Sequence, residues 1–169
     1  MIELLVNQTA LERVSLEAIR ALTEAATATN LSADRPNADR AADNRRVVEM
    51  SAATCAAAAD DPRRHLVVAV VGHALAGYMI ATIHGEDDRE LDWLMVDPQF
   101  HGRAIAGPLT EAGIDWLGRD RAQWLNVIND NARAIAFYRK HGFKIDPAMR
   151  SGHAVPRVIM RRAAGAVRP

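Results

Sequence analysis

The stretch Gln99–Gly107, QFHGRAIAG, combines residue types that suit the binding of an anion. It follows the apolar run Leu91–Val96, which suits a strand, and Pro98 cannot continue a central strand because it has no N–H to donate. Apolar residues then recur at helical spacing, at Ile105, Leu109, Ile114 and Leu117. A helix that begins here presents unpaired N–H groups and the positive end of its dipole to the loop. Because Gly102 and Ala104 carry little bulk, a phosphate could approach this backbone closely.

This loop alone is equally consistent with an ordinary strand-to-helix turn that contains a glycine. The sequence contains neither G-x-G-x-x-G nor G-x-x-x-x-G-K-[ST], so it supports neither a dinucleotide fold nor a P-loop. A second segment, Trp124–Phe143, reads as a strand and then a helix, with Asn131 placed to cap the helix. Phe137 and Tyr138 follow within that helix.

Together the two segments resemble the GNAT superfamily of acetyl-coenzyme A-dependent N-acetyltransferases. The cofactor loop of this family follows Q/R-x-x-G-x-G/A, which Gln99, Gly102 and Ala104 match. Its second motif, N-x-x-A-x-x-F-Y-x-x-x-G-F, is matched by Asn131, Ala134, Phe137, Tyr138, Gly142 and Phe143. The resemblance is strong over about 65–143 and weak over the first sixty residues. The sequence departs from the family pattern in having Ala104 where glycine is commoner, and Pro108 inside the first helical turns.

The resemblance implies one N-acetyltransferase domain over residues 1–169, which takes acetyl-coenzyme A as acetyl donor and a primary amine as acceptor. The pyrophosphate would lie on the N–H groups of the helix start, where Arg103 adds a charge-assisted contact. The pantetheine arm would run along the backbone of the strand that precedes the loop. The expected cofactor contacts are Leu94, Met95, Val96, Gly102, Arg103, Ala104, Ile105, Ala106, Gly107, Asn131, Ala134 and Tyr138.

Tyr138 is the expected general acid, because the family places a tyrosine at this position next to the sulfur of the cofactor. A phenol with a pKa of ~10 stays protonated at neutral pH and can give its proton to a thiolate. The alternative is a tyrosine that only fills the core side of an amphipathic helix.

A general base is also required, since an alkyl ammonium with a pKa of ~10.4 must lose a proton before it attacks. Asp92 and Glu90 lie two residues apart on the expected strand 89–96, and therefore on one face. Asp92 is favoured because Leu91 and Trp93 flank it, while His84 is a third candidate with a pKa near the working range. Each carboxylate could instead be a solvated strand residue.

Composition limits the classes of partner and compartment. The 169 residues carry a formal net charge of +0, which argues against nucleic acid and anionic membranes as partners. The lone Cys55 lies in an alanine-rich run and reads as a buried thiol, in keeping with a reducing cytoplasm. The six histidines show no metal-ligand spacing, so no metal is expected, and His101 reads as a surface residue. A homodimer is left open.

The elements that must position these residues indicate an α/β (α+β) fold. Residues 9–28 read as one helix with a capping box from Thr9 to Glu12, residues 30–37 as a loop, and residues 39–58 as a second helix. Three strands follow as a meander over residues 65–96. The resemblance implies a mixed, mostly antiparallel sheet with helices on both faces.

Two other classes of function compete with an enzyme. A domain that binds acetyl-coenzyme A only as a sensor would not need the phenol of Tyr138. A purely structural domain would not need the bare loop at Gly102. The family shapes its acceptor site with segments that correspond here to residues 31–39 and 146–156. With the adjoining Arg40, these segments carry charges of both signs and so exclude neither an acidic nor a basic acceptor.

Overall fold

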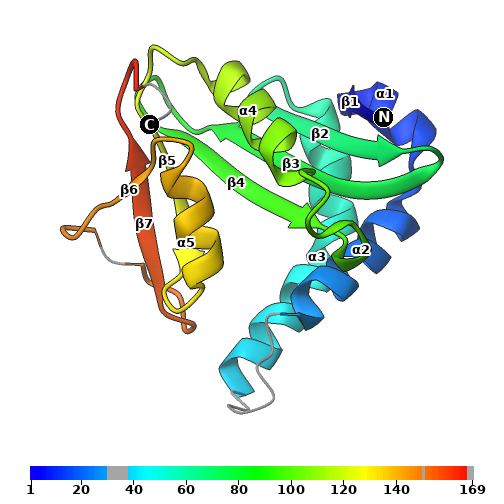
Figure 1. Ribbon diagram of the computed structural model, residues 1–169, viewed down its shortest axis with the longest axis horizontal. Coiled ribbons are helices and arrows are strands. Elements are labelled where there is room, and N and C mark those ends of the chain that lie inside the picture. Colours follow the sequence, from blue (N-terminus) through cyan, green and yellow to red (C-terminus); the bar gives the residue numbers. More distant parts are fainter. Residues whose placement is uncertain (30–37, 150, 167–169) are drawn as a thin grey trace.

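One seven-stranded sheet runs through the molecule with the strand order β1-β2-β3-β4-β5-β7-β6 (Figure 1). The structure is a computed structural model that describes residues 1–29, 38–149 and 151–166. The strands are β1 (Ile2–Val6), β2 (Arg64–Val71), β3 (Ala74–Ile83), β4 (Arg89–Val96), β5 (Gln123–Ile128), β6 (Lys144–Ile145) and β7 (Arg157–Arg162). The helices are α1 (Asn7–Arg13), α2 (Leu16–Ala28), α3 (Ala38–Asp60), α4 (Ala106–Leu117), α5 (Ala132–Arg139) and the 3-10 turn η1 (Pro98–Phe100).

Every neighbouring pair of strands is antiparallel except β4 and β5, which are parallel. The only register recorded between β4 and β5 within the described residues joins Glu90 to Trp124. Beyond this point the two strands diverge (Figure 1), so the backbone of β4 that faces β5 has no strand partner there. The sheet therefore opens in its middle, at the end of β4 that leads into the predicted anion loop.

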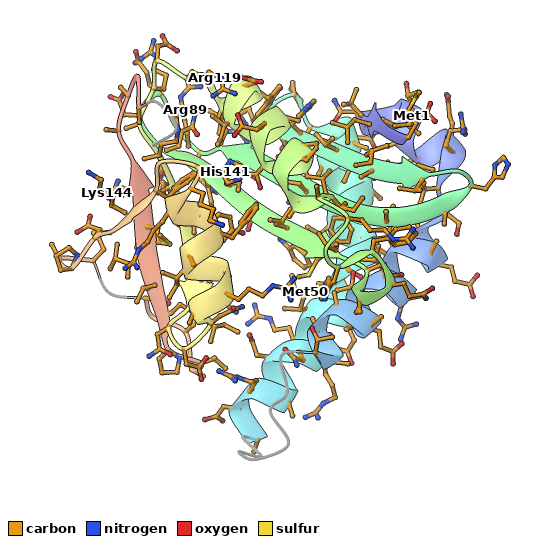
Figure 2. All side chains as sticks on the ribbon, viewed as in Figure 1. Met1, Met50, Arg89, Arg119, His141 and Lys144 are labelled. Atoms are coloured by element: carbon orange, nitrogen blue, oxygen red, sulfur yellow. The ribbon has the colours of Figure 1, made fainter. Side chains whose placement is uncertain are left out.

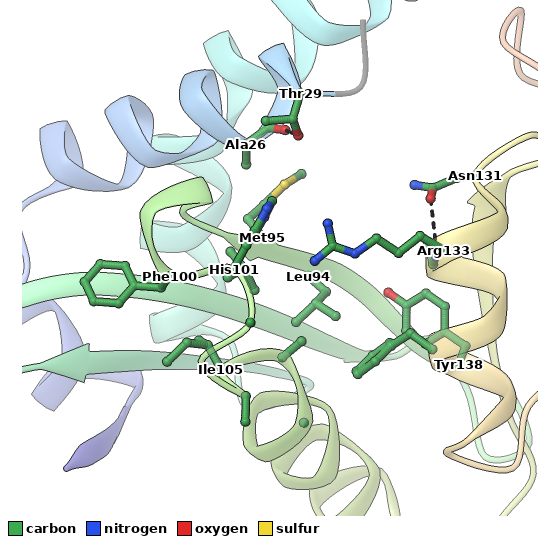
Figure 3. A pocket seen from close by; sticks show the side chains of 17 residues that line it. Ala26, Thr29, Leu94, Met95, Phe100, His101, Ile105, Asn131, Arg133 and Tyr138 are labelled. Carbon is green, nitrogen blue, oxygen red and sulfur yellow. Dashed lines mark hydrogen bonds between the residues drawn. The ribbon is translucent and has the colours of Figure 1, made fainter. Parts of the chain in front are cut away.

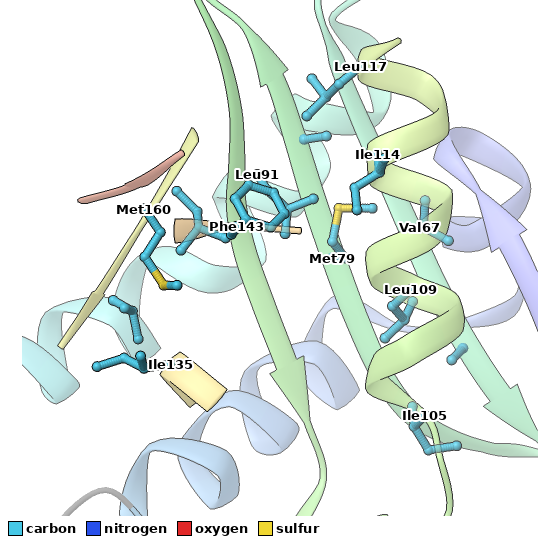
Figure 4. Packing of buried hydrophobic residues seen from close by; sticks show 14 of the residues in the cluster. Val67, Met79, Leu91, Ile105, Leu109, Ile114, Leu117, Ile135, Phe143 and Met160 are labelled. Carbon is cyan, nitrogen blue, oxygen red and sulfur yellow. The ribbon is translucent and has the colours of Figure 1, made fainter. Parts of the chain in front are cut away.

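Apolar residues cover both faces of the sheet, as alternation along buried strands predicts. On one face, Leu109 and Ile114 of α4 pack against Val67, Met79 and Leu91 (Figure 4). Ile135 of α5 and Phe143 belong to the same cluster. On the other face, α1, α2 and α3 pack against β2 and β3, with Cys55 fully buried among them. The predicted mixed, mostly antiparallel sheet with helices on both faces is confirmed.

Strand β4 contains a β-bulge. Ile80 pairs with Trp93 and Ala81 with Leu91, so Asp92 between them has no partner across the pair. After the bulge the alternation is reset, because Leu91 belongs to the core under α4 while Trp93 packs on the opposite face of the sheet. The strict alternation assumed from the sequence therefore does not hold along the whole of β4.

The predicted continuous helix over residues 9–28 is wrong. The chain breaks at Val14 and Ser15, and the Ser15 hydroxyl accepts a hydrogen bond from the N–H of Ala18 at 3.1 Å. The predicted capping box is also wrong, since Thr9 lies inside α1 and the helix begins at Asn7 without a side-chain cap. The cap that forms belongs to α2, where Ser15 satisfies an otherwise unpaired N–H.

The remaining predicted elements match the structure within a few residues, and the predicted loop at 30–37 lies outside the described residues. Among the residues that are described, no helix has the length and apolar content needed to span a bilayer.

Candidate active site

The predicted anion loop is held in a backbone shape that leaves space in front of it. Gly102 has φ 80° and Ala104 has φ 57°, both in the left-handed region. A Cβ added to Gly102 or to Gly107 would meet no heavy atom within 4 Å. Helix α4 begins at Ala106, directly after the loop, so its first N–H groups face this open space. The Cβ of Ala104 makes this left-handed conformation sterically unfavourable, which explains why the family motif has glycine more often than alanine at this position.

The space in front of the loop belongs to a cavity of ≈ 500 Å³ at the opening between β4 and α5, which is called here the loop cavity (Figure 3). Strand β4, the loop, the start of α4, the end of α2 and one side of α5 all contribute to its walls. Its lining residues are Ala26, Thr29, Leu94, Met95, Val96, Phe100, His101, Gly102, Ala104, Ile105, Ala106, Gly107, Asn131, Arg133, Ala134, Phe137 and Tyr138.

Of the predicted cofactor contacts, only Arg103 is absent from this lining. Its guanidinium lies over the ring of Phe100, 5.6 Å from the centroid. Arg133 is a lining residue that the sequence analysis missed, and Figure 3 shows it extending from α5 toward the loop that carries His101. An exposed arginine two residues after a helix cap carries no sequence signal of its own. Only the fold brings it opposite the anion loop.

Tyr138 lies on α5 with its hydroxyl pointing into the loop cavity (Figure 3). Helix α5 is fixed at its start by Asn131, whose side chain accepts a hydrogen bond from the N–H of Ala134 at 3.0 Å. Burial raises the pKa of the Tyr138 phenol above its ordinary value, which keeps its proton in place. The hydroxyl has no hydrogen-bond partner within the described part of the chain, in contrast to the buried Tyr78, which bonds Thr23 at 2.8 Å.

A second cavity of ≈ 700 Å³, called here the acceptor cavity, adjoins the first. It lies between α3 and the strands β4, β5 and β7, and its lining residues include Met50 of α3, which is labelled in Figure 2. The two cavities share the lining residues Leu94, Met95, Asn131, Ala134 and Tyr138. Tyr138 therefore stands where a molecule in one cavity would meet a molecule in the other.

Glu90 lies in the wall of the acceptor cavity at the end of a chain of hydrogen bonds. Its Oε2 contacts Nε2 of His84 at 2.7 Å, and its Oε1 accepts from Nδ2 of Asn126 at 3.3 Å. The Oδ1 of Asn126 accepts from Arg157 at 2.8 Å, and Arg157 also donates to Asp43 at 2.7 Å. Since Arg157 can only donate, it orients the Asn126 amide so that the amide nitrogen faces Glu90. Four elements, β4, β5, β7 and α3, together with the turn after β3 that carries His84, are needed to build this chain.

Burial is the main cause of the altered acidity of the two carboxylates. It acts with the nearby Asp92 to raise the pKa of Glu90 to about 7, despite the opposing effect of His84. Burial also raises the pKa of Asp92, and the charge of Arg64 opposes this. The Asp92 carboxylate accepts no hydrogen bond from any described residue and lines the acceptor cavity at the bulge. Both predicted carboxylates thus face one cavity, while His84 contacts Glu90 and does not line it.

Two cavities thus meet at Tyr138 where the sheet opens, and the wall of the second carries the carboxylates of Glu90 and Asp92. The model of the acetyltransferase (GNAT) family matches residues 17–143 of the sequence. The chain belongs to the GNAT family.

Relatives of this chain include an uncharacterized N-acetyltransferase of Mycobacterium tuberculosis, 38% identical over 102 residues. The match covers 57% of this chain and 64% of that relative, which is less than two thirds of its length. The L-amino acid N-acetyltransferase of Escherichia coli is 31% identical over 116 residues, covering 62% of this chain and 71% of that protein. The PaiA N-acetyltransferase from Thermoplasma acidophilum in complex with coenzyme A has a similar fold, with a TM-score of 0.71 at 19% identity over 96% of this chain and 99% of that chain.

Proposed function

We propose that the protein transfers an acetyl group from acetyl-coenzyme A to a primary amine of a small molecule or peptide. The observation that carries the proposal is the junction of the two cavities at Tyr138. One cavity begins at a bare anion-binding loop and the other is lined by two carboxylates, so each suits one of the two substrates.

The loop cavity would hold the donor. Open space at Gly102 and Gly107 leaves room for phosphate oxygens at the start of α4. Arg133 adds a positive charge from the opposite wall. On the side of β4 that faces β5, the backbone between Leu94 and Val96 has no strand partner among the described residues and can supply hydrogen-bonding groups to an extended amide-bearing arm. The bound donor supplies the acetyl thioester, and the chain supplies its position.

The acceptor cavity would hold the amine and remove its proton. Asp92, a carboxylate with a free acceptor face, suits direct contact with the ammonium group. Glu90, whose pKa is raised to about 7, suits the role of proton acceptor, because a carboxylate with a raised pKa is a stronger base than an ordinary glutamate. His84, whose side chain is 42% exposed, lies between Glu90 and solvent and could carry the proton away.

Tyr138 would complete the transfer. As the new C–N bond forms and the C–S bond breaks, the departing sulfur gains negative charge, and the phenol can give it a proton. The raised pKa of Tyr138 keeps the phenol protonated at the start of the reaction, while the same shift makes it a weaker acid toward the sulfur. The phenol then recovers a proton from the amine nitrogen or from water, so that the products are an amide and a free thiol.

Incubation with acetyl-coenzyme A and a panel of amines, with detection of free thiol, tests this proposal. We expect thiol release that depends on the amine. The second candidate is a sensor that binds acetyl-coenzyme A without turning it over. The unpartnered phenol at the junction of the cavities disfavours it, because binding alone does not require that group. Binding of coenzyme A without thiol release from any amine would decide for the sensor.

A further inference from the structure

We infer that the acceptor is a small amine that also carries a carboxylate, as a free amino acid does. This inference rests on the proposed function and concerns the same site. It comes from the charges that line the acceptor cavity and from which of them already have partners inside the protein.

The acidic charges include one without a partner. Asp43 is paired with Arg157 at 2.7 Å, and Glu90 contacts His84 at 2.7 Å. Asp92 lines the same cavity and forms no ion pair or hydrogen bond with the described residues. A cationic group of the acceptor would add a direct partner for this carboxylate, and an ammonium group is such a partner.

Among the described residues, two basic groups of the cavity are also incompletely paired. Arg46 lines the cavity from α3, one helical turn after Asp43, and no carboxylate in the described ranges pairs with it. The Nε of Arg157 is buried without a hydrogen-bond partner. His153 lies within electrostatic reach of both arginines, and their charges help to lower its pKa. Within the described part of the chain, this side of the cavity thus offers the exposed guanidinium of Arg46 and the Nε of Arg157 as donors without a partner.

An amine alone would compensate Asp92 and leave Arg46 and the Nε of Arg157 without a partner among the described residues. A carboxylate on the same molecule matches them, because guanidinium groups bind carboxylates through charge-assisted hydrogen bonds. Arg157 is also close enough to Asp92 to lower the pKa of that carboxyl. Positive and negative groups of the protein therefore lie near one another, as an amino acid with adjacent ammonium and carboxylate groups requires. Apolar walls at Trp93 and Met50 leave room for a side chain.

Three matched acceptors test the inference: phenylalanine, its amide, and phenethylamine, which lacks the carboxyl group. We expect kcat/KM for phenylalanine to exceed that for the other two by roughly 10- to 100-fold, the range for a hydrogen-bonded charge. A dipeptide that begins with phenylalanine separates a free amino acid from a peptide, since its carboxylate is displaced, and it should behave like the amide.

Arg46→Gln should bring the ratio of kcat/KM between phenylalanine and phenethylamine close to one. Arg45→Gln is the matched control, because Arg45 is exposed on the same helix and does not line this cavity. The control should keep the wild-type ratio. Thermal unfolding of both variants checks that the fold survives.

The outcomes separate this inference from the function on which it rests. Turnover of phenethylamine or of the dipeptide at least as fast as that of phenylalanine overturns the inference while leaving an N-acetyltransferase. A preference that survives in Arg46→Gln also overturns it. No thiol release from any acceptor overturns the proposed function, and this inference with it.

Discussion

The chain has two tyrosines, Tyr138 and Tyr78. The Tyr138 hydroxyl points into the loop cavity without a hydrogen-bond partner among the described residues, whereas the Tyr78 hydroxyl is buried and bonds Thr23. Tyr138→Phe removes an unpartnered hydroxyl from the cavity and leaves the ring contacts to Phe137 and Phe143 in place. If the phenol protonates the leaving sulfur, the turnover rate should fall by roughly 10²-fold. Coenzyme A affinity should change little, which titration with coenzyme A measures separately from the rate.

Tyr78→Phe is the control for this substitution. It removes the hydroxyl that bonds Thr23 in the core, so it should lower the melting temperature without a comparable loss of turnover. Equal rates for Tyr138→Phe and wild type would return Tyr138 to a core-filling role and leave water as the proton donor. Weaker coenzyme A binding with an unchanged rate per bound complex would make it a binding residue.

Glu90 should control the pH dependence of turnover. A base works only when it is deprotonated, so kcat/KM should rise with pH through a pKa of about 7. In Glu90→Gln this rise should be lost, and residual activity should increase only as the amine itself deprotonates at higher pH. A pH–rate profile measures both. Asp92→Asn in the same assay should weaken amine binding, and Glu86→Gln, in the exposed turn before β4, should match wild type.

The same glutamate has an opposite effect on stability, which provides an independent check. The folded protein binds the Glu90 proton more tightly than the unfolded chain, because its pKa is raised from 4.5 to about 7. Stability from this group is therefore present at low pH and is lost as pH rises through that interval. Glu90→Gln should unfold at a higher temperature than wild type at pH 8 and show no such gain near pH 4. A pH-independent difference would show that Glu90 is not the buried group described here.

At the scale of elements, the start of α4 and its loop should bind the phosphates. Gly102→Val places a side chain in the open space in front of the loop, and it should abolish the rise in melting temperature that coenzyme A causes. Gly72→Val is a matched control. Gly72 also has a positive φ and open space around it, but it lies in the β2–β3 turn away from both cavities. Both variants carry similar backbone strain, so only the ligand response should separate them.

A folded Gly102→Val protein that still responds to coenzyme A would contradict the phosphate assignment. Loss of the response in Gly72→Val as well would show that strain, and not occupied space, is the cause.

Most elements could be predicted from the sequence because their signals are local. The β2–β4 meander follows from buried apolar runs with turns between them, and the α4 and α5 helices follow from apolar spacing with Asn131 as a cap. The break at Ser15 was missed because an apolar stripe continues through it. The bulge at Asp92 was missed because a bulge is a property of the pairing of two strands, which one strand does not encode by itself.

Residues of the candidate site could be predicted where they belong to a motif of fixed spacing. Residues that are far apart in the sequence and meet only in the folded chain could not. Gly102, Ala104 and Tyr138, which the motifs predicted as cofactor-binding or catalytic residues, line the loop cavity, and those roles stay predictions. Arg133 and Arg157 gave no signal, since arginines at the start of a helix or strand are usually solvated and only the fold places these two at the cavities. The network around Glu90 joins residues that are far apart in the sequence.

At the scale of the whole molecule, the donor should act as a link between two halves of the sheet. Strands β1–β4 with α4 form one half, and β5–β7 with α5 form the other. Among the described residues, β4 and β5 share one register pair. The halves are also joined by hydrogen bonds that include Trp124 to Asp88 and His141 to Glu111, each at 2.7 Å, and Asn126 to Glu90 at 3.3 Å, and both halves contribute to one apolar cluster. The loop cavity has walls from both halves, so a ligand that fills it adds contacts across the opening.

We therefore expect coenzyme A at 100 times its Kd to raise the melting temperature by roughly 5–10 °C, because it binds only the folded state. Hydrogen exchange should slow both at the start of α4 and along α5, whose Ala134 and Tyr138 line the cavity. Adenosine 3′,5′-bisphosphate, which has phosphates but no pantetheine arm, should slow exchange at α4 and leave α5 unchanged. Protection of α5 by this fragment, or no protection of α5 by coenzyme A, would show that the arm does not cross between the halves at Tyr138.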